Sequence, residues 1–367
     1  MAKLGNGRGN MFFDMLRLPH HNMHALEVIA LFAQVDQARV QSLASLLAEY
    51  IKVNVPAAIE RRNGLADYRT NPYVLMTTAK IMDLDDPARF ADFLFNNKLY
   101  MGLETSFGKS IEAAFVNPYP LHPLTRQRWA EAPEKLLEFK TYEGLSREEK
   151  AKRRTDAVWR EIDKSCVIEN HRYMTSIKSG PNCINDSQVQ AMTRAIIDNI
   201  GMWMSDTKKT YPHVSELDVV VGITYGTDRT TNNKENQILV KLLDYGFVEE
   251  DRVNRPGVLI DSATRSIRVY RRIGKDFWAF IGNPTAPESA SFTFLEILLA
   301  LAKSLTMLMA EADLETKVNA RIQALCDALS RMRFPRNSLP EWVRAELSDK
   351  ELFWFATAMS AFYDVGV

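Results

Sequence analysis

The spacing of hydrophobic residues predicts helices over much of the chain. From His24 to Ile51 the apolar residues recur every three or four positions, which predicts two helices or one helix broken near Asp36. Asp86-Pro87 has the composition of a helix start. The same helical spacing returns in further segments, which are 104–115, 145–160, 187–204, 294–309, 314–332 and 340–362. Helical regions are therefore expected at both ends of the chain.

Turn and capping residues mark the boundaries between these segments. Pro56 and the basic stretch 61–64 predict a loop. Asn185 or Asp186 is expected to cap the helix that begins near Ser187.

Two apolar runs that are rich in β-branched residues predict a hairpin within the segment Arg160 to Gln190. Asp163 lies where the first run begins. The second run, Tyr173 to Ile177, ends on Lys178. Because a hairpin pairs residues near its two open ends, we expect Asp163 and Lys178 to lie side by side at that end. The sequence therefore predicts an acid and a lysine together at one end of a sheet.

Later strands are predicted from further runs of β-branched and aromatic residues. Leu217 to Tyr225 is a continuous apolar run, which is typical of a buried strand covered on both faces. Gly226 to Asn236 is polar throughout and predicts a loop outside the core. Shorter strands are expected at 258–260, 267–270 and 277–281. The order helix, hairpin, helix and buried strand predicts a mixed α/β core with helical additions at both ends.

Composition is that of a globular protein with ample core. The 367 residues are 46% hydrophobic and 25% charged. No apolar run approaches the roughly 18–20 residues that span a membrane, since Lys303 interrupts the longest candidate. No signal peptide is evident, and three cysteines outside metal-ligand spacing are typical of a reduced, cytoplasmic protein. A formal net charge of zero excludes a globally basic nucleic-acid coat but leaves a local basic groove open.

Carboxylates near the predicted hairpin suggest a site for a hard cation. Glu104 and Glu112 are two turns apart on a predicted helix, so both can point to one side of it. With Asp163, Lys178 and the backbone carbonyl of Ile177 they form a candidate Mg²⁺ site. A metal in such a site polarises a phosphoryl oxygen and activates water, and a neighbouring lysine can orient that water or neutralise developing charge. This combination is suited to phosphodiester hydrolysis.

The two glutamates also fit a simpler role, since a pair of glutamates on a helix often forms only a solvated face. A second, weaker metal candidate is the cluster His20, His21 and His24. No glycine-rich phosphate loop, HExxH motif or paired CxxC motif competes with the hairpin.

Several segments, in order, resemble one family of nucleases. Ser176 to Met192 (SIKSGPNCINDSQVQAM) resembles the lysine-bearing motif of type II restriction endonucleases of the PmeII kind, in the PD-(D/E)xK nuclease superfamily. Asn71-Pro72-Tyr73, followed by ETSFGKSIE, is similar to the upstream part of that family. Glu216 to Gly226 resembles its next core strand, and Gly274 to Pro284 its later tryptophan-containing strand. The likeness covers 71–285 with long gaps.

The resemblance implies an α/β fold with an αβββαβ nuclease core and a mixed sheet. A helical region would occupy 1–70, the core with its DNA-recognition loops 71–285, and a second helical region 286–367. Mg²⁺-dependent cleavage of duplex DNA at a short sequence is implied as well. Glu112 matches the helix glutamate, with Glu104 as a second candidate, while Asp163 matches the metal-binding aspartate and Lys178 the lysine.

Ser176 departs from the pattern of the superfamily, which usually has an acid two residues before the lysine. The PmeII-like proteins share this serine, so Ser176 is kept as a candidate site residue. Gln188 and Gln190 stand where a helix-borne acid would be expected. The second carboxylate ligand is therefore unassigned.

Polar loops are the candidates for DNA recognition. The loop 226–236 carries Asn, Arg and Lys donors that match purine edges, although an ordinary solvated connection has the same composition. Basic residues elsewhere are expected on phosphates. The candidate DNA-binding residues are Asn182, Asn185, Gln188, Arg229, Asn232, Asn233, Lys234, Arg271, Arg272 and Lys275.

The function that these features favour is that of a type II restriction endonuclease in the cytoplasm of a bacterium or archaeon. It would bind duplex DNA as a two-fold homodimer and work beside a cognate DNA methyltransferase, with no membrane involved. Two alternatives are a DNA-binding protein whose nuclease site has decayed, and a non-catalytic helical interaction protein.

Overall fold

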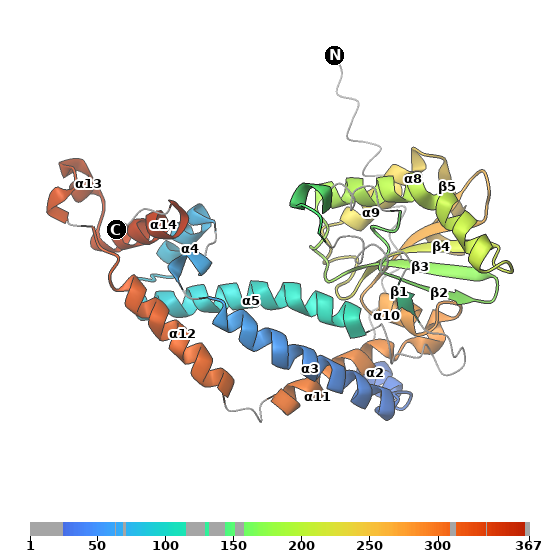
Figure 1. The fold of residues 1–367 in the computed structure, drawn as a ribbon, viewed down its shortest axis with the longest axis horizontal. Helices are drawn as coiled ribbons and strands as arrows, with labels where there is room; N and C mark the ends of the chain where they lie inside the picture. Colours follow the sequence, from blue (N-terminus) through green and yellow to red (C-terminus); the bar gives the residue numbers. More distant parts are fainter. Residues whose placement is uncertain are drawn as a thin grey trace, which may run out of the picture. The chain divides into compact units, whose positions relative to one another are not determined.

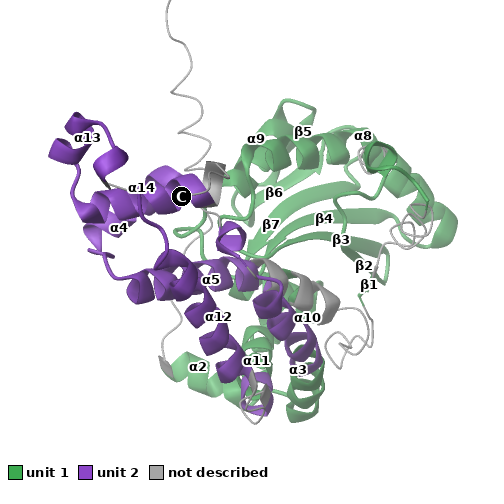
Figure 2. Cartoon of the chain, turned by 60° about the vertical axis from the view of Figure 1, so that its left-hand side comes forward, with its two compact units in different colours: residues 1–47, 108–303 green, residues 48–107, 304–367 purple. Residues whose placement is uncertain are grey.

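The computed structural model describes residues 25–62, 64–68, 71–114, 129–131, 144–150, 158–308, 313–334 and 336–363. The chain divides into two compact units, coloured separately in Figure 2. Unit 1 comprises residues 1–47 and 108–303, and unit 2 comprises residues 48–107 and 304–367. These units cut across the expected division at residues 70 and 285, because segments distant in sequence pack together within each of them.

Unit 2 is helical. Its described segments include the carboxyl-terminal half of α3 (Gln37–Glu60), η1 (Leu65–Tyr68), α4 (Pro72–Ile81), most of α5 (Pro87–Ala114), α12 (Asp313–Leu329), η3 (Arg336–Ser338), α13 (Glu341–Glu346) and α14 (Asp349–Tyr363). Its core contains Phe90, Phe95 and Leu325, and the fully buried Trp354, whose indole N–H donates to the Leu84 carbonyl at 2.7 Å. This last bond ties α14 to the turn before α5.

Unit 1 is built on a seven-stranded mixed sheet in the order β1-β2-β3-β4-β7-β6-β5. The strands are β1 (Ala130–Glu131), β2 (Lys164–Ile168), β3 (His171–Lys178), β4 (Glu216–Ile223), β5 (Phe247–Asp251), β6 (Arg255–Asp261) and β7 (Ile267–Ile273). Strands β3, β4 and β7 are parallel neighbours, and the other pairs are antiparallel. The carboxyl ends of three central strands therefore meet at one edge of the sheet.

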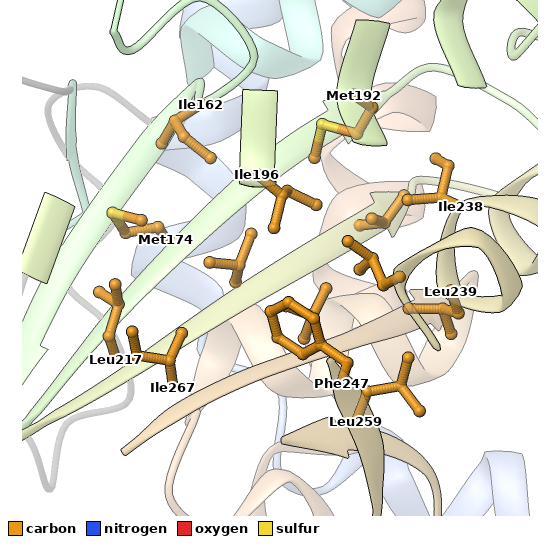
Figure 3. Packing of buried hydrophobic residues seen from close by; sticks show 14 of the residues in the cluster. Ile162, Met174, Met192, Ile196, Leu217, Ile238, Leu239, Phe247, Leu259 and Ile267 are labelled. Atoms are coloured by element: carbon orange, nitrogen blue, oxygen red, sulfur yellow. The ribbon is translucent and has the colours of Figure 1, made fainter. Parts of the chain in front are cut away.

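Helices cover both faces of this sheet (Figure 1). Helices α8 (Asp186–Thr210) and α9 (Lys234–Leu243) lie on one face, and α10 (Lys275–Gly282) lies on the other. Figure 3 shows Met192 and Ile196 of α8 with Ile238 of α9 over the strand residues Met174 and Leu217. On the opposite face, α10 packs its aromatic residues against a second buried cluster. Central strand β4 is buried along its whole length after Glu216 because both faces are covered.

A buried arginine fixes α8 to β3. Arg172 is 1% exposed, and its guanidinium donates to the Thr207 hydroxyl at 2.9 Å and lies 3.3 Å from the Asp206 carboxylate. The same guanidinium lies over the Trp159 ring at 4.8 Å. Such contacts offset the cost of burying the charge.

Several of the sequence predictions for these elements are confirmed. The break near Asp36 separates α2 (Ala25–Phe32) from α3 (Gln37–Glu60). The hairpin is β2 and β3, and α8 begins with a capping box in which Asn185 and Gln188 exchange hydrogen bonds. The predicted apolar helices at 294–309 and 314–332 are α11 (Thr293–Leu308) and α12.

Other predictions were wrong. Phe277 to Ile281, expected as a strand, lies in α10, because every residue of this short apolar run is buried and its pattern cannot distinguish a strand from a buried helix. Pro56 lies inside α3 and not in a loop, and the segment 340–362 forms two helices, α13 and α14. The histidines at positions 20, 21 and 24 lie outside the described residues.

One apolar stretch of the described chain, Pro287–Met307, is long and apolar enough by length and composition to cross a membrane, with a mean hydropathy of 1.4. It contains Glu296, which is fully buried and accepts two hydrogen bonds from the Arg39 guanidinium, at 2.9 and 3.0 Å. A buried, doubly bonded ion pair is typical of a helix packed inside a protein unit.

Candidate functional site

The open end of the β2–β3 hairpin brings Asp163 against the backbone next to Lys178. Ladder pairing begins at Lys164, opposite Thr175, and the Asp163 N–H donates to the Thr175 carbonyl at 2.9 Å. The Asp163 side chain bends across to β3, where Oδ2 accepts the Ile177 N–H at 2.6 Å. This bond fixes a carboxylate one residue before the lysine, at the carboxyl end of β3.

Lys178 forms an ion pair with Glu161, an acid that was not among the candidate site residues. Its ammonium Nζ lies 3.5 Å from Oε2 of Glu161, and both side chains are about one-fifth exposed, at 18% and 20%. Glu161 was missed by the sequence reasoning, although its position two residues before Asp163 gives an acid-x-acid spacing that could have indicated it. The hairpin end therefore gathers two carboxylates and one ammonium.

Two tryptophans hold the turn that leads through Glu161 to Asp163. Trp159 is 1% exposed and stacks on Trp203 of α8, with ring centroids 5.9 Å apart. The Trp203 indole N–H donates to the Val158 carbonyl at 2.9 Å, and Ile162 is fully buried beside this pair in the same cluster. Because the residues flanking Glu161 are packed into the core, its position is fixed by tertiary contacts.

Ser176 lies on the same face of β3 as Lys178, since alternate residues of a strand share a face. It is fully buried, and its hydroxyl has no hydrogen-bond partner within the part of the chain that the structure describes. Continuing the β2–β3 register by one residue places Asp163 opposite Ser176. Ser176, whose hydroxyl has unused hydrogen-bonding capacity, therefore lies opposite Asp163 in the register.

The carboxyl-terminal turns of α5 pack against the same end of the hairpin. A Cβ added at Gly108 would lie 2.5 Å from the Ser179 Cβ, so this glycine permits the close approach. Ile111 packs against the cluster that contains Ile177. Glu112 belongs to this part of the helix, but its side chain lies outside the described residues. Glu104 is exposed and belongs to the part of α5 counted in unit 2.

The donors at the hairpin end fit a hard cation with few protein ligands. The Lys178 carbonyl points toward β4, where it accepts the Thr224 N–H at 3.0 Å. Because successive carbonyls of a strand point to opposite sides, the Ile177 carbonyl points toward Asp163, as its N–H does. Among the described residues no three His, Cys, Asp or Glu side chains form a metal-binding group. One or two carboxylates plus water suffice for Mg²⁺, and the described residues supply two carboxylates, Asp163 and Glu161, at this end of the hairpin.

The loops that follow β3, β4 and β7 are tied together next to this site. The Thr224 hydroxyl donates to the Ser179 carbonyl at 2.9 Å, and the Asn232 N–H donates to the Pro181 carbonyl at 3.2 Å. Gly274, with φ of 55°, lies so close to Gly226 that an added Cβ would be 2.3 Å from the Gly226 carbonyl oxygen. Ligands of sheets with parallel strands bind at the carboxyl ends of those strands, so this edge is a favourable place for a substrate.

Asn182 and Arg229, among the predicted DNA-binding residues, are exposed on these loops; Asn185 is exposed as well, but it caps α8. Tyr225 is also exposed there, with its ring packed over Gly180. Sequence reasoning missed Tyr225 because it stands at the end of an apolar run that is typical of a buried strand. A flat aromatic ring and two hydrogen-bonding side chains thus share the edge with Lys178.

Most of the other predicted DNA-binding residues already have structural hydrogen bonds. Asn185 and Gln188 form the capping box of α8. The Asn232 amide donates to the Ile184 carbonyl at 2.8 Å, which ties two loops together. Asn233 has a left-handed backbone and accepts a hydrogen bond from Asn236, and the Lys234 ammonium pairs with Asp186.

Arg271 corrects the expectation of a phosphate contact, because it is 3% exposed. Its guanidinium bonds to Asp228 and lies 3.5 Å from the buried Glu235 carboxylate. The predicted loop 226–236 thus ends in the buried first turn of α9. Arg272 lies over the Tyr270 ring at 4.8 Å, and Lys275, in the first turn of α10, is half-buried.

A second group of charges lies at the opposite, amino ends of β3, β4 and β7. The Arg268 guanidinium donates to Glu216 and, at 2.7 Å, to Glu250, and it lies 3.7 Å from Asp218. His171 lies 3.6 Å from Glu216. This cluster contains both signs of charge in close contact.

The environment shifts the pKa values of the acids in this second group in opposite directions. Burial raises the pKa of Asp218, and the nearby Arg268 only partly offsets it. Burial also acts against ionisation of Glu216, but hydrogen bonding from Arg268 and the charge of His171 outweigh it and lower the pKa of Glu216. The Tyr270 hydroxyl donates to Asp218 at 3.0 Å.

Comparison with known proteins adds no family assignment. No protein-family model matches the chain, and no curated protein matches its sequence. The case for a function therefore depends on the residues of this chain and their geometry.

Proposed function

We propose that this protein is a Mg²⁺-dependent type II restriction endonuclease of the PD-(D/E)xK kind. The observation that carries the proposal is the bond from the Ile177 N–H to the Asp163 carboxylate at 2.6 Å. It joins the acid immediately before β2 to the backbone beside Lys178, so that a carboxylate able to hold a metal lies close to an ammonium, a combination suited to metal-assisted phosphodiester hydrolysis.

The order of elements supports the proposal independently. Among the described elements, helix α5, strands β1, β2 and β3, helix α8 and strand β4 come in that order along the chain, with helical residues 147–150 between β1 and β2. This order is compatible with an αβββαβ core. The meander β1–β2–β3 is antiparallel, and α8 connects β3 to the parallel strand β4. The segment Gly274 to Pro284 gives no support, because its tryptophan lies in α10 and not in a strand.

The proposed mechanism assigns a separate task to each group. Asp163, the Ile177 carbonyl and a glutamate of α5, Glu112, would hold the Mg²⁺ ion. A Mg²⁺ ion held by these residues would polarise a phosphoryl oxygen and make a water molecule more acidic. Lys178 would donate hydrogen bonds to the attacking water or to the oxygens on which negative charge develops. The exposed side chains of Asn182, Tyr225 and Arg229 would contact the DNA.

The partners of the proposed enzyme follow from this chemistry. Its substrate is duplex DNA, and two copies related by two-fold symmetry would present one site to each strand. A cognate DNA methyltransferase would protect the host sequence. The proposed setting is the cytoplasm of a bacterium or archaeon.

Digestion of several fully sequenced DNAs with Mg²⁺, followed by mapping of the fragment ends, tests the activity. We expect discrete fragments that share a short sequence at their ends. Asp163→Asn and Lys178→Ala should each lower the cleavage rate by about 10²- to 10³-fold, because each removes a group that acts on the transition state. The matched controls Asp198→Asn and Lys209→Ala change exposed residues of α8 and should cut at the parent rate.

Different outcomes would decide between the alternatives. A parent protein that binds duplex DNA but cuts with neither Mg²⁺ nor Mn²⁺ is a DNA-binding protein with a decayed site. One that neither binds nor cuts supports the helical interaction protein. If the parent cuts and both site variants cut as fast, the assigned site is wrong.

A further inference from the structure

We infer that Glu161 supplies the second carboxylate of the site, in place of the acid that the superfamily usually has at the position of Ser176. This inference rests on the proposed metal-dependent nuclease and names a ligand that the sequence left unassigned. Glu161 would bind the divalent cation together with Asp163.

The first observation is where Glu161 lies. Its Oε2 is 3.5 Å from the ammonium of Lys178, while the carboxylate of Asp163 contacts the residue immediately before that lysine. Glu161 is therefore beside the lysine in space, as an acid two residues before the lysine would be. Both carboxylates come from one short turn, so their separation depends on few backbone angles.

The second observation is the state of Ser176. Its hydroxyl is fully buried, has no hydrogen-bond partner among the described residues, and lies on the face of β3 that carries Lys178. An unsatisfied buried hydroxyl is costly, so a polar neighbour is expected beside it. A cation or its bound water held by Asp163 and Glu161 would supply that neighbour.

The third observation is that the turn is held rigidly on both sides of Glu161. Trp159 stacks on Trp203 and lies under the Arg172 guanidinium, and Ile162 is fully buried. A ligand must be fixed to bind a small ion well, and these contacts fix the backbone that carries Glu161. An exposed loop glutamate without such packing would not meet this requirement.

The ion pair also suggests how Lys178 is kept in place before a cation binds. The carboxylate of Glu161 neutralises and orients the ammonium, at 3.5 Å. If Glu161 turned to a cation, the ammonium would be free to donate its hydrogen bonds to water or phosphate. Glu161 would thus serve the site both with and without the cation.

Calorimetric titration with Mn²⁺ in the absence of DNA tests the inference without relying on cleavage. We expect Glu161→Gln, which keeps the shape of the side chain, to weaken Mn²⁺ binding at least tenfold. The control Glu288→Gln changes an exposed glutamate of unit 1 and should leave binding unchanged. Circular dichroism and thermal unfolding of each variant establish that it is folded.

A second experiment moves the carboxylate from position 161 to position 176. The double variant Glu161→Gln/Ser176→Asp returns a carboxylate to the usual position on β3, and we expect it to recover part of the Mn²⁺ affinity and of the cleavage rate that Glu161→Gln loses. If Glu161 only stabilises the turn, an acid at position 176 should restore neither the Mn²⁺ affinity nor the cleavage rate.

The outcomes separate this inference from the proposed function. If Glu161→Gln binds Mn²⁺ and cuts DNA as the parent does, Glu161 is not a ligand, while the nuclease proposal stands. If the parent binds Mn²⁺ through Glu161 but cuts no DNA, the ligand assignment stands and the nuclease proposal fails. A parent that binds no Mn²⁺ overturns both.

Discussion

The two ends of the parallel strands β3, β4 and β7 differ in how their charged groups are paired. At the amino ends, Arg268 lies within 4 Å of three carboxylates, and Tyr270 donates to one of them. At the carboxyl ends, Lys178 lies 3.5 Å from a single carboxylate, that of Glu161, and the Ser176 hydroxyl has no partner in the described parts of the chain. At the first end one cation is shared by three carboxylates, although Asp218 Oδ1 and His171 Nδ1 have no hydrogen-bond partner among the described residues. At the second end the lysine has one paired acid, and a buried hydroxyl is without a partner there.

This difference separates structural charge from charge available for chemistry. Buried charges that satisfy one another hold strands together, and removing one of them leaves the others uncompensated. Groups at the carboxyl ends of parallel strands lie where sheets of this kind bind ligands. We therefore expect substitutions at the amino ends to affect stability and those at the carboxyl ends to affect binding and catalysis.

Arg268→Met tests the structural end most severely. The variant should lose about 3 kcal/mol of unfolding free energy, because three carboxylates lose their common cation in a mostly buried setting. Urea denaturation followed by circular dichroism measures this loss, with the exposed Arg252→Met as the control. Cleavage per folded molecule should be unchanged. A stable variant with reduced cleavage would reverse the roles assigned to the two ends.

Ser176→Ala tests the carboxyl end with a much smaller change. Removing a buried hydroxyl whose hydrogen-bonding capacity is unused should raise the unfolding free energy by up to about 1 kcal/mol. The same denaturation measurement, with Ser262→Ala as an exposed control, detects the change. A clear loss of stability would mean that the hydroxyl is satisfied in solution, and the contrast between the two ends would weaken.

The pH dependence of stability should have opposite signs at two acids of the amino end. The lowered pKa of Glu216 gives stability above its unfolded value of about 4.3, and this stability is lost as the pH falls through the folded value. The raised pKa of Asp218 makes ionisation unfavourable, so its contribution falls as the pH rises from about 3.9 through the folded value. Thermal unfolding from about pH 3 to about pH 7 measures both effects. The stability of Glu216→Gln should approach that of the parent as the pH falls, and the stability of Asp218→Asn should rise relative to that of the parent as the pH rises. Parallel curves for both variants would contradict these shifts.

Much of the fold could be predicted where local pattern and tertiary packing agree. The hairpin, the cap of α8 and the buried strand β4 were all evident from apolar spacing and turn residues. Phe277 to Ile281 was misassigned because all of its residues are buried, which removes the polar face that would have revealed a helix. Glu235 of α9 is buried although its segment was predicted as a loop. Its partner, Arg271, is 36 residues away, so the local sequence does not show that this acid is paired inside the core.

The candidate site could be predicted only in part for a similar reason. Asp163 and Lys178 stand at the ends of predicted runs, so the hairpin pattern alone brings them to one end. Glu161 lies before the ladder begins, and its approach to Lys178 depends on the packing of Trp159 against α8. No local pattern records such a contact between a turn and a helix.

The close contact between Gly226 and Gly274 has a consequence for how this protein can diversify. The three loops at the carboxyl edge touch through their backbones, so lengthening or reshaping one of them would displace the other two. Insertions, which usually change the specificity of surface loops, are therefore expected to be poorly tolerated here. Altered recognition in descendants or engineered variants should arise from single substitutions at exposed tips such as Asn182, Tyr225 and Arg229.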